Sequence, residues 1–427
     1  MPLARDPSGA LRFGGLSLAE LVHDPGTPAY VYDVDAIAGG ARALGAAFDG
    51  DRHLVAYAIK ANAAGRIVRA LALAGCGADV VSGAELRVAV GCGIEPGRIV
   101  YSGVAKTDEE LDLAIGCGPA GIGAVQIESI EEVARVSARA RALGRKARVS
   151  LRVNPSLDLT GATHANIATG HDQAKFGVPS GDVLRAIDLA ETAPGLDLVG
   201  LSTHAGSQFM TTEPYRRAAR MLFGIVGALR SAGRGRSLSF VNTGGGFGVD
   251  YTGEQKNAVS PADFVSVARS ELREARLADL ALYIEPGRSI VAPHGLLLAR
   301  VIQSKVADAQ RWLMIDAGMN DLLRPALYQA RHRIVPVEIR ADERVIAWRV
   351  VGPVCESSDD FGAHDLPLEP PCAVAILDAG AYGYSMASQY NGRRLPVEVF
   401  VSQGRVVGVT QRAAVDGWAD ERVAAGG

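Results

Sequence analysis

The sequence lacks the features that would direct a protein into a membrane or out of the cell. None of its apolar runs approaches the ~20 residues of a membrane-spanning helix, so no such helix is expected. Residues 1–13 carry no apolar core followed by a cleavage site, which argues against a secretory signal. The five cysteines form no CxxC pair and no regular framework, so we expect thiols in a reducing cytoplasm and no metal site.

A large excess of charge is also lacking. The 427 residues carry a formal net charge of −3, with 48% hydrophobic and 21% charged residues. This balance is ordinary for a soluble globular enzyme and favours neither nucleic acid nor a membrane surface as a partner. A chain of this length is too long for one ordinary core, which predicts two domains or a barrel with an additional domain.

Lysine is scarce, because only six of the 44 basic residues are lysines. Lys60 ends the apolar run 54–59 and precedes small or turn-prone residues, a pattern typical of a buried strand that ends in a loop. Partial desolvation at such a place lowers the pKa of the amine, which can then form a Schiff base with an aldehyde. A lysine that simply reaches solvent explains this stretch equally well, so the rest of the chain has to decide.

A regular alternation of apolar runs and helical stretches starts at residue 54. The apolar runs end at Lys60, Ser82, Gly103, Glu128, Asn154, His204, Gly244 and Glu285. The helical stretches cover residues 67–74, 84–90, 109–115, 131–143, 183–193, 215–232 and 261–275. Three of them begin with S/T-x-x-E, at Ser82, Thr107 and Ser129, which indicates capping boxes. Eight such units in succession predict an α/β fold with a closed (β/α)8 TIM barrel rather than an open doubly wound sheet.

The pattern changes after Glu285. Residues 286–427 hold short alternating runs rich in β-branched residues and no long helical pattern, which predicts a C-terminal antiparallel β-domain. Residues 1–28 are too few for a domain and are expected to join that β-domain, while residues 29–285 form the barrel. Strand ends of such a barrel share one face, so Lys60, His204, the glycines 244–246 and Glu285 are predicted to meet.

Three motifs at strand ends indicate what this pocket binds. The glycines 244–246 let backbone N–H groups surround an anion, and barrels commonly bind phosphate after strands seven and eight; a flexible turn is the alternative. Glu285 can keep a pyridine nitrogen protonated, or it forms an ordinary ion pair with Arg288. His204 can lie flat on a planar ring while Ser207 donates to a phosphate oxygen, although a lone histidine is more often structural.

These motifs, together with others along nearly the whole chain, resemble the diaminopimelate decarboxylase group of the fold-type-III, alanine-racemase-like enzymes that use pyridoxal 5′-phosphate. The matching stretches are 26–33, 57–62, 79–85, 167–170, 175–177, 204–208, 244–246, 285–288, 316–328, 352–357 and 380–382. The last of these resemble decarboxylases rather than racemases of this fold. The resemblance implies a carboxy-lyase that converts meso-2,6-diaminopimelate to L-lysine and CO2, the final step of lysine biosynthesis.

The resemblance also implies which residues bind the cofactor. Lys60 would carry pyridoxal 5′-phosphate, His204 would stack on its ring, and Glu285 would pair with the ring nitrogen. The phosphate would be held by backbone and side-chain donors of Ser207, Gly245, Gly246, Gly287, Arg288 and Tyr382.

Substrate binding would fall to a second set of residues. The carboxylate that is kept would be bound by Arg288, Arg324 and Tyr328, with Tyr382 also lining the substrate site. Glu356 would bind the distal ammonium and Cys355 would reprotonate the carbanion. In the family Cys355 and Glu356 come from the second subunit, so the resemblance implies a homodimer with shared active sites.

Two departures from the family pattern and several alternatives remain. Ala64 stands where the family motif Lys-Ala-Asn-x-Asn often has its last asparagine, and the loop 163–174 is unusual in detail. Related decarboxylases act on ornithine, arginine, carboxynorspermidine or carrier-bound glutamate. A racemase is disfavoured, because racemases of this fold usually place an arginine at the ring nitrogen. A non-catalytic cofactor-binding relative is disfavoured, because Lys60 and Cys355 are both kept.

Overall fold

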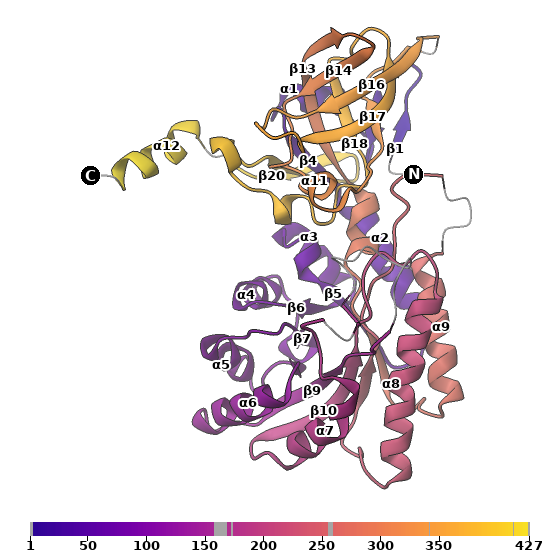
Figure 1. Cartoon of the computed structure of the whole chain (residues 1–427), viewed down its shortest axis with the longest axis vertical. Coiled ribbons are helices and arrows are strands. Elements are labelled where there is room, and N and C mark those ends of the chain that lie inside the picture. Colours follow the sequence, from indigo (N-terminus) through magenta and orange to yellow (C-terminus); the bar gives the residue numbers. More distant parts are fainter. Residues whose placement is uncertain are drawn as a thin grey trace. The chain divides into compact units, whose positions relative to one another are not determined.

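The computed structural model describes residues 3–157, 169–171, 174–254, 259–340, 342–412 and 414–425. The chain divides into two compact units (Figure 1). The barrel unit comprises residues 38–249 and 257–289, and the β unit comprises residues 1–37, 250–256 and 290–427. In this division residues 29–37 lie in the β unit, whereas the sequence pattern predicted a barrel from residue 29.

The barrel unit contains a closed parallel barrel with the strand order β10-β11-β12-β5-β6-β7-β8-β9. Its strands are β5 (His53–Ala58), β6 (Gly77–Val80), β7 (Ile99–Tyr101), β8 (Ala124–Ile127), β9 (Ala147–Val153), β10 (Leu196–Thr203), β11 (Phe240–Asn242) and β12 (Ala281–Ile284). Each ends one or two residues before the end predicted from the sequence. The parallel pairing of β12 with β5 closes the barrel, which confirms the predicted fold.

Helices surround the barrel strands in Figure 1. They are α3 (Gly65–Leu73), α4 (Gly83–Gly91), α5 (Asp108–Gly116), α6 (Ile130–Ala142), α7 (Val183–Thr192), α8 (Glu213–Ser231) and α9 (Pro261–Glu274), and α2 (Val34–Ala46) precedes β5. The capping box predicted at Thr107 is complete, because the Thr107 hydroxyl accepts from the backbone N–H of Glu110 and the Glu110 carboxylate accepts from the backbone N–H of Thr107. At the other two predicted boxes the serine caps its helix, but the glutamate accepts from the residue before the serine.

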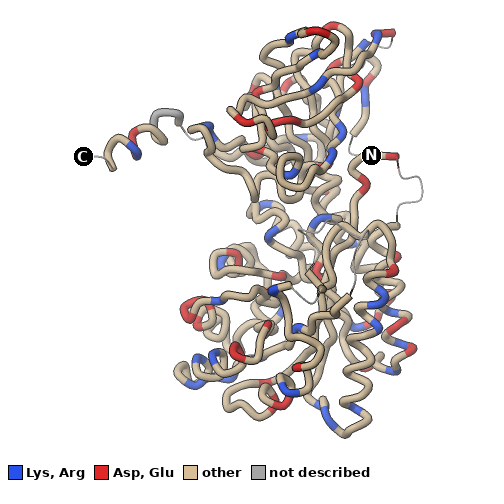
Figure 2. Tube along the Cα trace, in the orientation of Figure 1, with Lys and Arg blue, Asp and Glu red and all other residues tan. Residues whose placement is uncertain are grey.

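The outer helices are amphipathic. On α8, for example, Tyr215, Leu222 and Val226 are buried. Figure 2 shows basic and acidic positions along the helices of the barrel unit. Apolar residues therefore pack α8 against the barrel, as in an amphipathic surface helix. Among the described residues, no helix combines the length and the apolar character needed to cross a membrane.

The β unit is built on a mixed sheet whose main order is β17-β16-β14-β13-β4-β19-β20. Its strands are β4 (Ala29–Asp33), β13 (Gly295–Ala307), β14 (Gln310–Ile315), β15 (Ile334–Pro336), β16 (Val345–Val351), β17 (Asp360–Pro367), β18 (Ala373–Ile376), β19 (Val397–Ser402) and β20 (Arg405–Val409). The pairs β14–β16 and β19–β4 are parallel, so the sheet is mixed rather than purely antiparallel as predicted. Long stretches of chain connect both parallel pairs, as parallel pairing requires.

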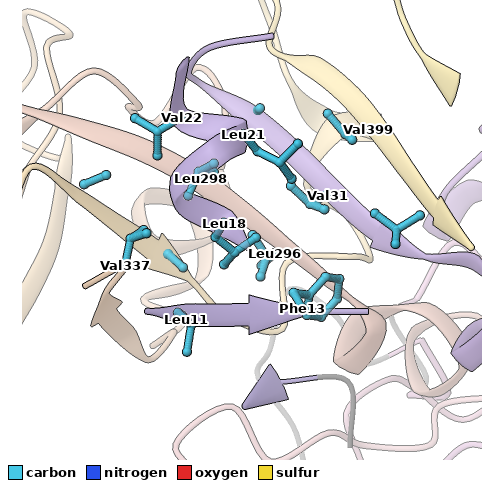
Figure 3. Close-up of a cluster of buried hydrophobic side chains, with 14 of the residues drawn as sticks. Leu11, Phe13, Leu18, Leu21, Val22, Val31, Leu296, Leu298, Val337 and Val399 are labelled. Carbon is cyan, nitrogen blue, oxygen red and sulfur yellow. The ribbon is translucent and has the colours of Figure 1, made fainter. Parts of the chain in front are cut away.

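The N-terminal segment supplies part of the core of the β unit. The strands β1 (Leu3–Arg5), β2 (Leu11–Phe13) and β3 (Leu16–Ser17) form a small sheet, and α1 (Leu18–His23) follows it. Figure 3 shows Leu18 and Phe13 beside Leu296 of β13 in one apolar cluster. The unit also contains α11 (Arg324–Tyr328) and α12 (Val415–Ala424), and the four-residue α10 (Arg288–Val291) joins the two units.

Candidate active site

Lys60 lies on a rigid element at the carboxyl end of β5. It occupies a short 3-10 helix (Ile59–Ala61), and its Nζ forms an ion pair with the carboxylate of Asp79. The Asp79 side chain is completely buried, whereas 40% of the Lys60 side chain is exposed. The amine therefore reaches an interior charge while part of its side chain stays accessible, so the solvent-only interpretation of Lys60 is wrong.

Backbone contacts fix the turn that follows Lys60. The hydroxyl of Tyr57 donates to the carbonyl oxygen of Asn62 at 2.9 Å, and Asn62 Oδ1 accepts from the backbone N–H of Ala64 at 3.0 Å. Ala64 is the N-cap of α3 and offers no side-chain acceptor to the first turn. The departure from the family motif at Ala64 therefore affects a helix cap, where an asparagine would accept a backbone N–H.

A chain of hydrogen bonds continues from Asp79 across the barrel interior. Ser102 donates to Asp79 Oδ1 at 2.6 Å, and Nε2 of Gln126 donates to Ser102 Oγ at 2.6 Å. The same Nε2 donates to Glu285 Oε1 at 2.9 Å, and Asn242 Nδ2 donates to that oxygen at 2.6 Å. Side chains at the ends of β6, β7, β8, β11 and β12 are thereby joined into one polar network.

Glu285 has the properties of a carboxyl group prepared for proton sharing. Burial raises its pKa to about 7, and the negative charge of Asp79 acts in the same direction. The positive charge of Lys60 and the hydrogen bond from Asn242 oppose this rise. A carboxyl group with a pKa near neutrality is suited to share a proton with a weakly basic ring nitrogen.

The glycines 244–246 form a turn in which backbone packs against backbone. Gly244 and Gly246 have φ angles of +70° and +94°, a region that favours glycine. A Cβ atom on Gly245 would lie 2.1 Å from the carbonyl oxygen of Glu285, and one on Gly246 would lie 2.2 Å from that of Gly206. Side chains are thus excluded from this turn, as expected for a loop whose N–H groups approach an anion.

Two neighbouring loops bring side chains to the glycine turn. Gly245 N–H donates to Nδ1 of His204 at 3.1 Å, so the ring is neutral and carries its proton on Nε2. Burial lowers the pKa of His204 well below 6.5, which agrees with the neutral ring. Arg288 donates from Nη2 to Ser207 Oγ at 3.0 Å. A Cβ atom on Gly287 would lie 2.9 Å from that of Ala61, so this loop also packs beside Lys60.

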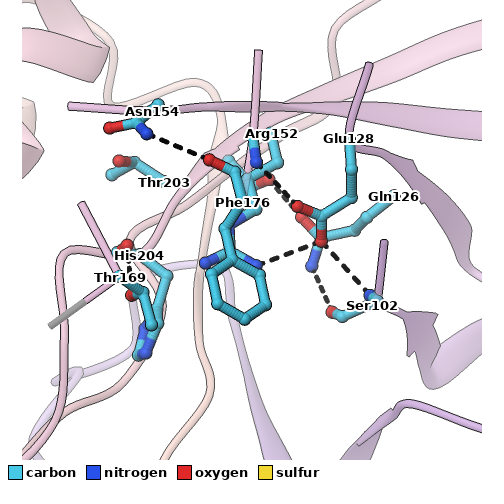
Figure 4. A network of polar contacts seen from close by, with 12 residues as sticks. Ser102, Gln126, Glu128, Arg152, Asn154, Thr169, Phe176, Thr203 and His204 are labelled. Carbon is cyan, nitrogen blue, oxygen red and sulfur yellow. Dashed lines mark hydrogen bonds and ion pairs between the residues drawn. The ribbon is translucent and has the colours of Figure 1, made fainter. Parts of the chain in front are cut away.

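A buried ion pair supports the neighbouring strand ends (Figure 4). Nη1 of Arg152 lies 3.0 Å from Glu128 Oε1, and their side chains are 9% and 2% exposed. The guanidinium of Arg152 also lies 4.9 Å from the ring centroid of Phe176. Asn154 donates to the backbone oxygen of Phe176 at 3.0 Å, which anchors part of the stretch 175–177. Most of the unusual loop 163–174 lies outside the described residues.

Within the β unit, α11 presents Arg324 and Tyr328. Arg324 is buried and donates from Nη1 to Nε2 of His332 at 2.6 Å, while Nδ1 of His332 bonds the Leu377 carbonyl oxygen at 2.8 Å. Its guanidinium lies 4.2 Å from the ring centroid of Tyr251. Tyr328 is half-buried at the other end of the helix. The direction of the guanidinium is therefore fixed by two aromatic side chains.

Cys355 and Glu356 occupy an exposed loop between β16 and β17. The backbone N–H of Cys355 donates to Asn391 Oδ1 at 2.9 Å, and the hydroxyl of Tyr390 donates to Glu356 Oε1 at 2.6 Å. Tyr382 is half-buried, and its φ of 55° is in the left-handed region. Because Cys355 is exposed, it is not part of the buried core of the β unit.

The barrel unit thus brings together eight of the predicted residues, namely Lys60, His204, Ser207, Gly245, Gly246, Glu285, Gly287 and Arg288. Sequence reasoning assigned no role to the polar residues that hold them, Asp79, Ser102, Gln126 and Asn242. Among these, Asp79 and Gln126 stand inside short apolar runs, where a polar side chain has to find a partner. That signal would have marked them as interior residues, although it would not have named their partners.

Comparisons with known proteins agree with this geometry. Residues 35–292 match the family model described as "Pyridoxal-dependent decarboxylase, pyridoxal binding domain". The diaminopimelate decarboxylase of Zymomonas mobilis is 39% identical over 96% of both chains, and that of Aquifex aeolicus is 38% identical over 96% of this chain and 94% of its own. The crystal structure of Helicobacter pylori diaminopimelate decarboxylase complexed with L-lysine has a TM-score of 0.88 and 37% identity, and covers 96% of this chain and 100% of that chain.

Proposed function

The chain belongs to the pyridoxal-dependent decarboxylase family, and we propose that it removes one carboxylate of meso-2,6-diaminopimelate as CO2 and leaves L-lysine. One observation carries the proposal: Lys60, the glycine turn 244–246 and Glu285 are linked at one end of a closed barrel. Relatives that match almost the whole chain and bear the name diaminopimelate decarboxylase support this choice of substrate.

The barrel residues fit pyridoxal 5′-phosphate. Its aldehyde needs an amine, which Lys60 offers, and its phosphate needs donors, which Ser207, Arg288 and the backbone of the turn 244–246 can supply. Its ring nitrogen needs a proton-sharing partner, and Glu285 has a pKa near 7. When bound, the cofactor supplies an electron sink for the carbon that loses CO2.

The residues of the barrel then perform separate tasks. Glu285 holds the proton at the ring nitrogen, which keeps the electron sink strong. His204, as a neutral ring, packs beside the glycine turn without adding charge. Asp79 pairs with Nζ of Lys60 and so orients the amine at the end of β5.

Substrate recognition is the second part of the proposal. Arg288, Arg324 and Tyr328 bind the carboxylate that is kept, since guanidinium groups pair bidentately with carboxylates. Glu356 binds the distal ammonium and Cys355 delivers a proton from Sγ to the carbon that has lost CO2.

The complete site further requires a homodimer in which the loop with Cys355 and Glu356 serves the partner subunit. Exposure of both residues supports this role, because an exposed loop is accessible to a second chain. Tyr382 is assigned to the phosphate and to the substrate. A cytoplasmic location remains a prediction from the cysteine usage; all five cysteines are free thiols.

The test is product formation by the purified protein with added pyridoxal 5′-phosphate. Equimolar CO2 and L-lysine should appear from meso-2,6-diaminopimelate. Ornithine, arginine, carboxynorspermidine and carrier-bound glutamate should be turned over at least ~100-fold less efficiently, because a site built for a distal head group with both a carboxylate and an ammonium leaves buried polar groups unpaired when the substrate lacks one of them. Faster turnover of one of these would move the substrate assignment to that compound. Failure with all five would contradict the decarboxylase proposal.

A further inference from the structure

The hydrogen bonds inside the barrel have a fixed direction, and Gln126 of β8 determines it. This residue is 1% exposed, and every polar group of its amide is used. Nε2 donates to Ser102 and to Glu285, while Oε1 accepts from the hydroxyl of Ser202; Figure 4 shows the side chains of Gln126 and Ser102 in contact. An amide donates only from nitrogen and accepts only at oxygen, so turning it over would remove the N–H donors from Ser102 and Glu285 and would place the amide oxygen against the Glu285 carboxyl group.

On one side of Gln126, the direction of the hydrogen bonds determines which proton donors face the carboxylate of Asp79. The oxygen of Ser102 accepts an N–H from Gln126, so its single proton points to Asp79 Oδ1, 2.6 Å away. Asp79 Oδ2 pairs with Lys60. Both oxygens of this fully buried carboxylate therefore accept protons from neighbours, which is the pattern of an ionised carboxylate. Gln126 thereby supports the anion that faces the amine of Lys60.

On the other side, the same direction specifies which oxygen of Glu285 can carry a proton. Oε1 accepts N–H groups from both Gln126 and Asn242, at 2.9 and 2.6 Å. An oxygen that accepts two donors in this way carries no proton, so a proton on this carboxyl group resides on Oε2. The charged groups that act on Glu285 are Asp79 on β6, Lys60 after β5 and Arg152 on β9.

We propose that Gln126 is a positioning residue, which turns Oε2 of Glu285 toward the cofactor ring nitrogen and links this carboxyl group to Asp79 and Lys60. The inference rests on the proposed function, because it assigns partners within the same site. The ligand group concerned is a pyridine-type nitrogen that shares a proton with a carboxyl group. A side chain that only filled space on β8 would need neither of the two N–H donors.

The experiment compares three variants of the full chain with the wild-type protein. Gln126→Glu keeps the shape but replaces the donor with an acceptor, and Gln126→Met keeps the approximate volume without any polar group. Ser202→Ala is the matched control, since it removes the hydrogen bond to Oε1 and leaves both N–H donors in place. Four quantities are measured: the Kd of pyridoxal 5′-phosphate by fluorescence titration, the absorbance of the loaded protein against pH, kcat, and KM. Thermal unfolding without cofactor reports whether each variant folds.

Both Gln126 variants should shift the midpoint of the absorbance titration by about one pH unit or more. They should also lower kcat by ~10- to 100-fold with little change in KM, as expected when a hydrogen bond to a charged group is lost. Ser202→Ala should stay within ~3-fold of the wild type in kcat, because the donors remain. If Gln126→Glu does not fold, Gln126→Met decides alone.

Folded variants with the wild-type absorbance titration would overturn the role of Gln126, as would a Ser202→Ala effect as large as that of the Gln126 variants. Unfolding of both Gln126 variants would also overturn it in favour of a purely structural role. The spectral titration needs no substrate, so it distinguishes the two proposals. A wild-type protein that binds the cofactor but releases no CO2 would contradict the proposed function alone.

Discussion

The barrel end and the loop between β16 and β17 hold their candidate residues in opposite ways. In the barrel, Asp79, Gln126 and Glu285 belong to one interior network to which several strands contribute. In the loop, Cys355 and Glu356 are exposed; the backbone N–H of Cys355 donates to Asn391 Oδ1, and the Glu356 carboxylate accepts from the hydroxyl of Tyr390. We conclude that the fold of the barrel unit itself holds Lys60 and Glu285 in place, whereas Cys355 and Glu356 are carried on an exposed loop.

The largest effect should come from the loop. Cys355→Ala removes the proposed proton donor and should lower the rate of lysine formation by ~100-fold or more, the range typical of a lost general acid. The Kd of pyridoxal 5′-phosphate should stay unchanged, because the barrel holds the cofactor. Cys372→Ala, at another exposed cysteine, is the control and should keep full activity. If the affinity for the cofactor fell together with the rate, the loop would also contribute to cofactor binding, which would contradict the division of roles between the loop and the barrel.

A smaller effect is expected from the buried carboxyl group of the barrel. The pKa of Glu285 is about 7 in the fold and about 4.5 when the chain is unfolded, so its favourable contribution is complete below pH ~4.5 and is lost as the pH rises through 7. Between pH 5 and pH 8 the cofactor-free wild type should therefore lose unfolding free energy, whereas Glu285→Gln lacks this pH dependence. The stability of the variant relative to the wild type should rise by ~1–3 kcal/mol from pH 5 to pH 8. Urea unfolding at both pH values measures the difference. An equal stability difference at both pH values would contradict the raised pKa.

The hydroxyl of Tyr390 tests whether Glu356, on the exposed loop, contributes to substrate binding. Tyr390→Phe removes the 2.6 Å hydrogen bond to Glu356 and should raise KM for meso-2,6-diaminopimelate by ~3- to 10-fold while kcat changes little, because the bond is exposed. Steady-state kinetics measures both constants. Tyr384→Phe, which also removes one tyrosine hydroxyl of the β unit, is the control. A change confined to kcat would assign Tyr390 to the chemical step instead.

The smallest effect concerns the cap of α3. Ala64→Asn supplies the missing side-chain acceptor at the N-cap and should raise the unfolding free energy by ~0.5–1 kcal/mol. Ala63→Asn, one residue earlier and exposed, places the same side chain outside the cap and serves as the control. Thermal unfolding compares the two. If both variants have the same Tm, the alanine at position 64 does not lower the stability of the protein through a missing N-cap.

The apolar runs in the sequence were sufficient to predict the barrel strands, because each run ends where the buried strand ends and a loop begins. The same logic brought Lys60, the glycine turn 244–246 and Glu285 to one end. It did not predict that Gln126 would meet Ser102 and Glu285, since partners inside a barrel depend on how the strands are staggered, which a single strand does not encode. Resemblance to a family supplied roles for residues, but not the side chains that hold them.

The β unit was harder to predict, for a related reason. The run that forms β4 was interpreted as a strand leading into the barrel, yet it pairs with β13 and β19, far away in the sequence. Pairings over such separations are set by packing and not by the run itself. The bond between Tyr390 and Glu356 likewise joins two loops, so no spacing along the chain indicates it.

The most direct test of the account is to find which lysine carries the cofactor. The protein is loaded with pyridoxal 5′-phosphate, reduced with borohydride, digested and analysed by mass spectrometry. Exposed Lys146→Ala should leave the labelling unchanged, and Lys60→Ala should abolish it. The account predicts one phosphopyridoxyl group, on the peptide that contains Lys60. A label on another lysine, or no label on a protein that binds the cofactor, would contradict it.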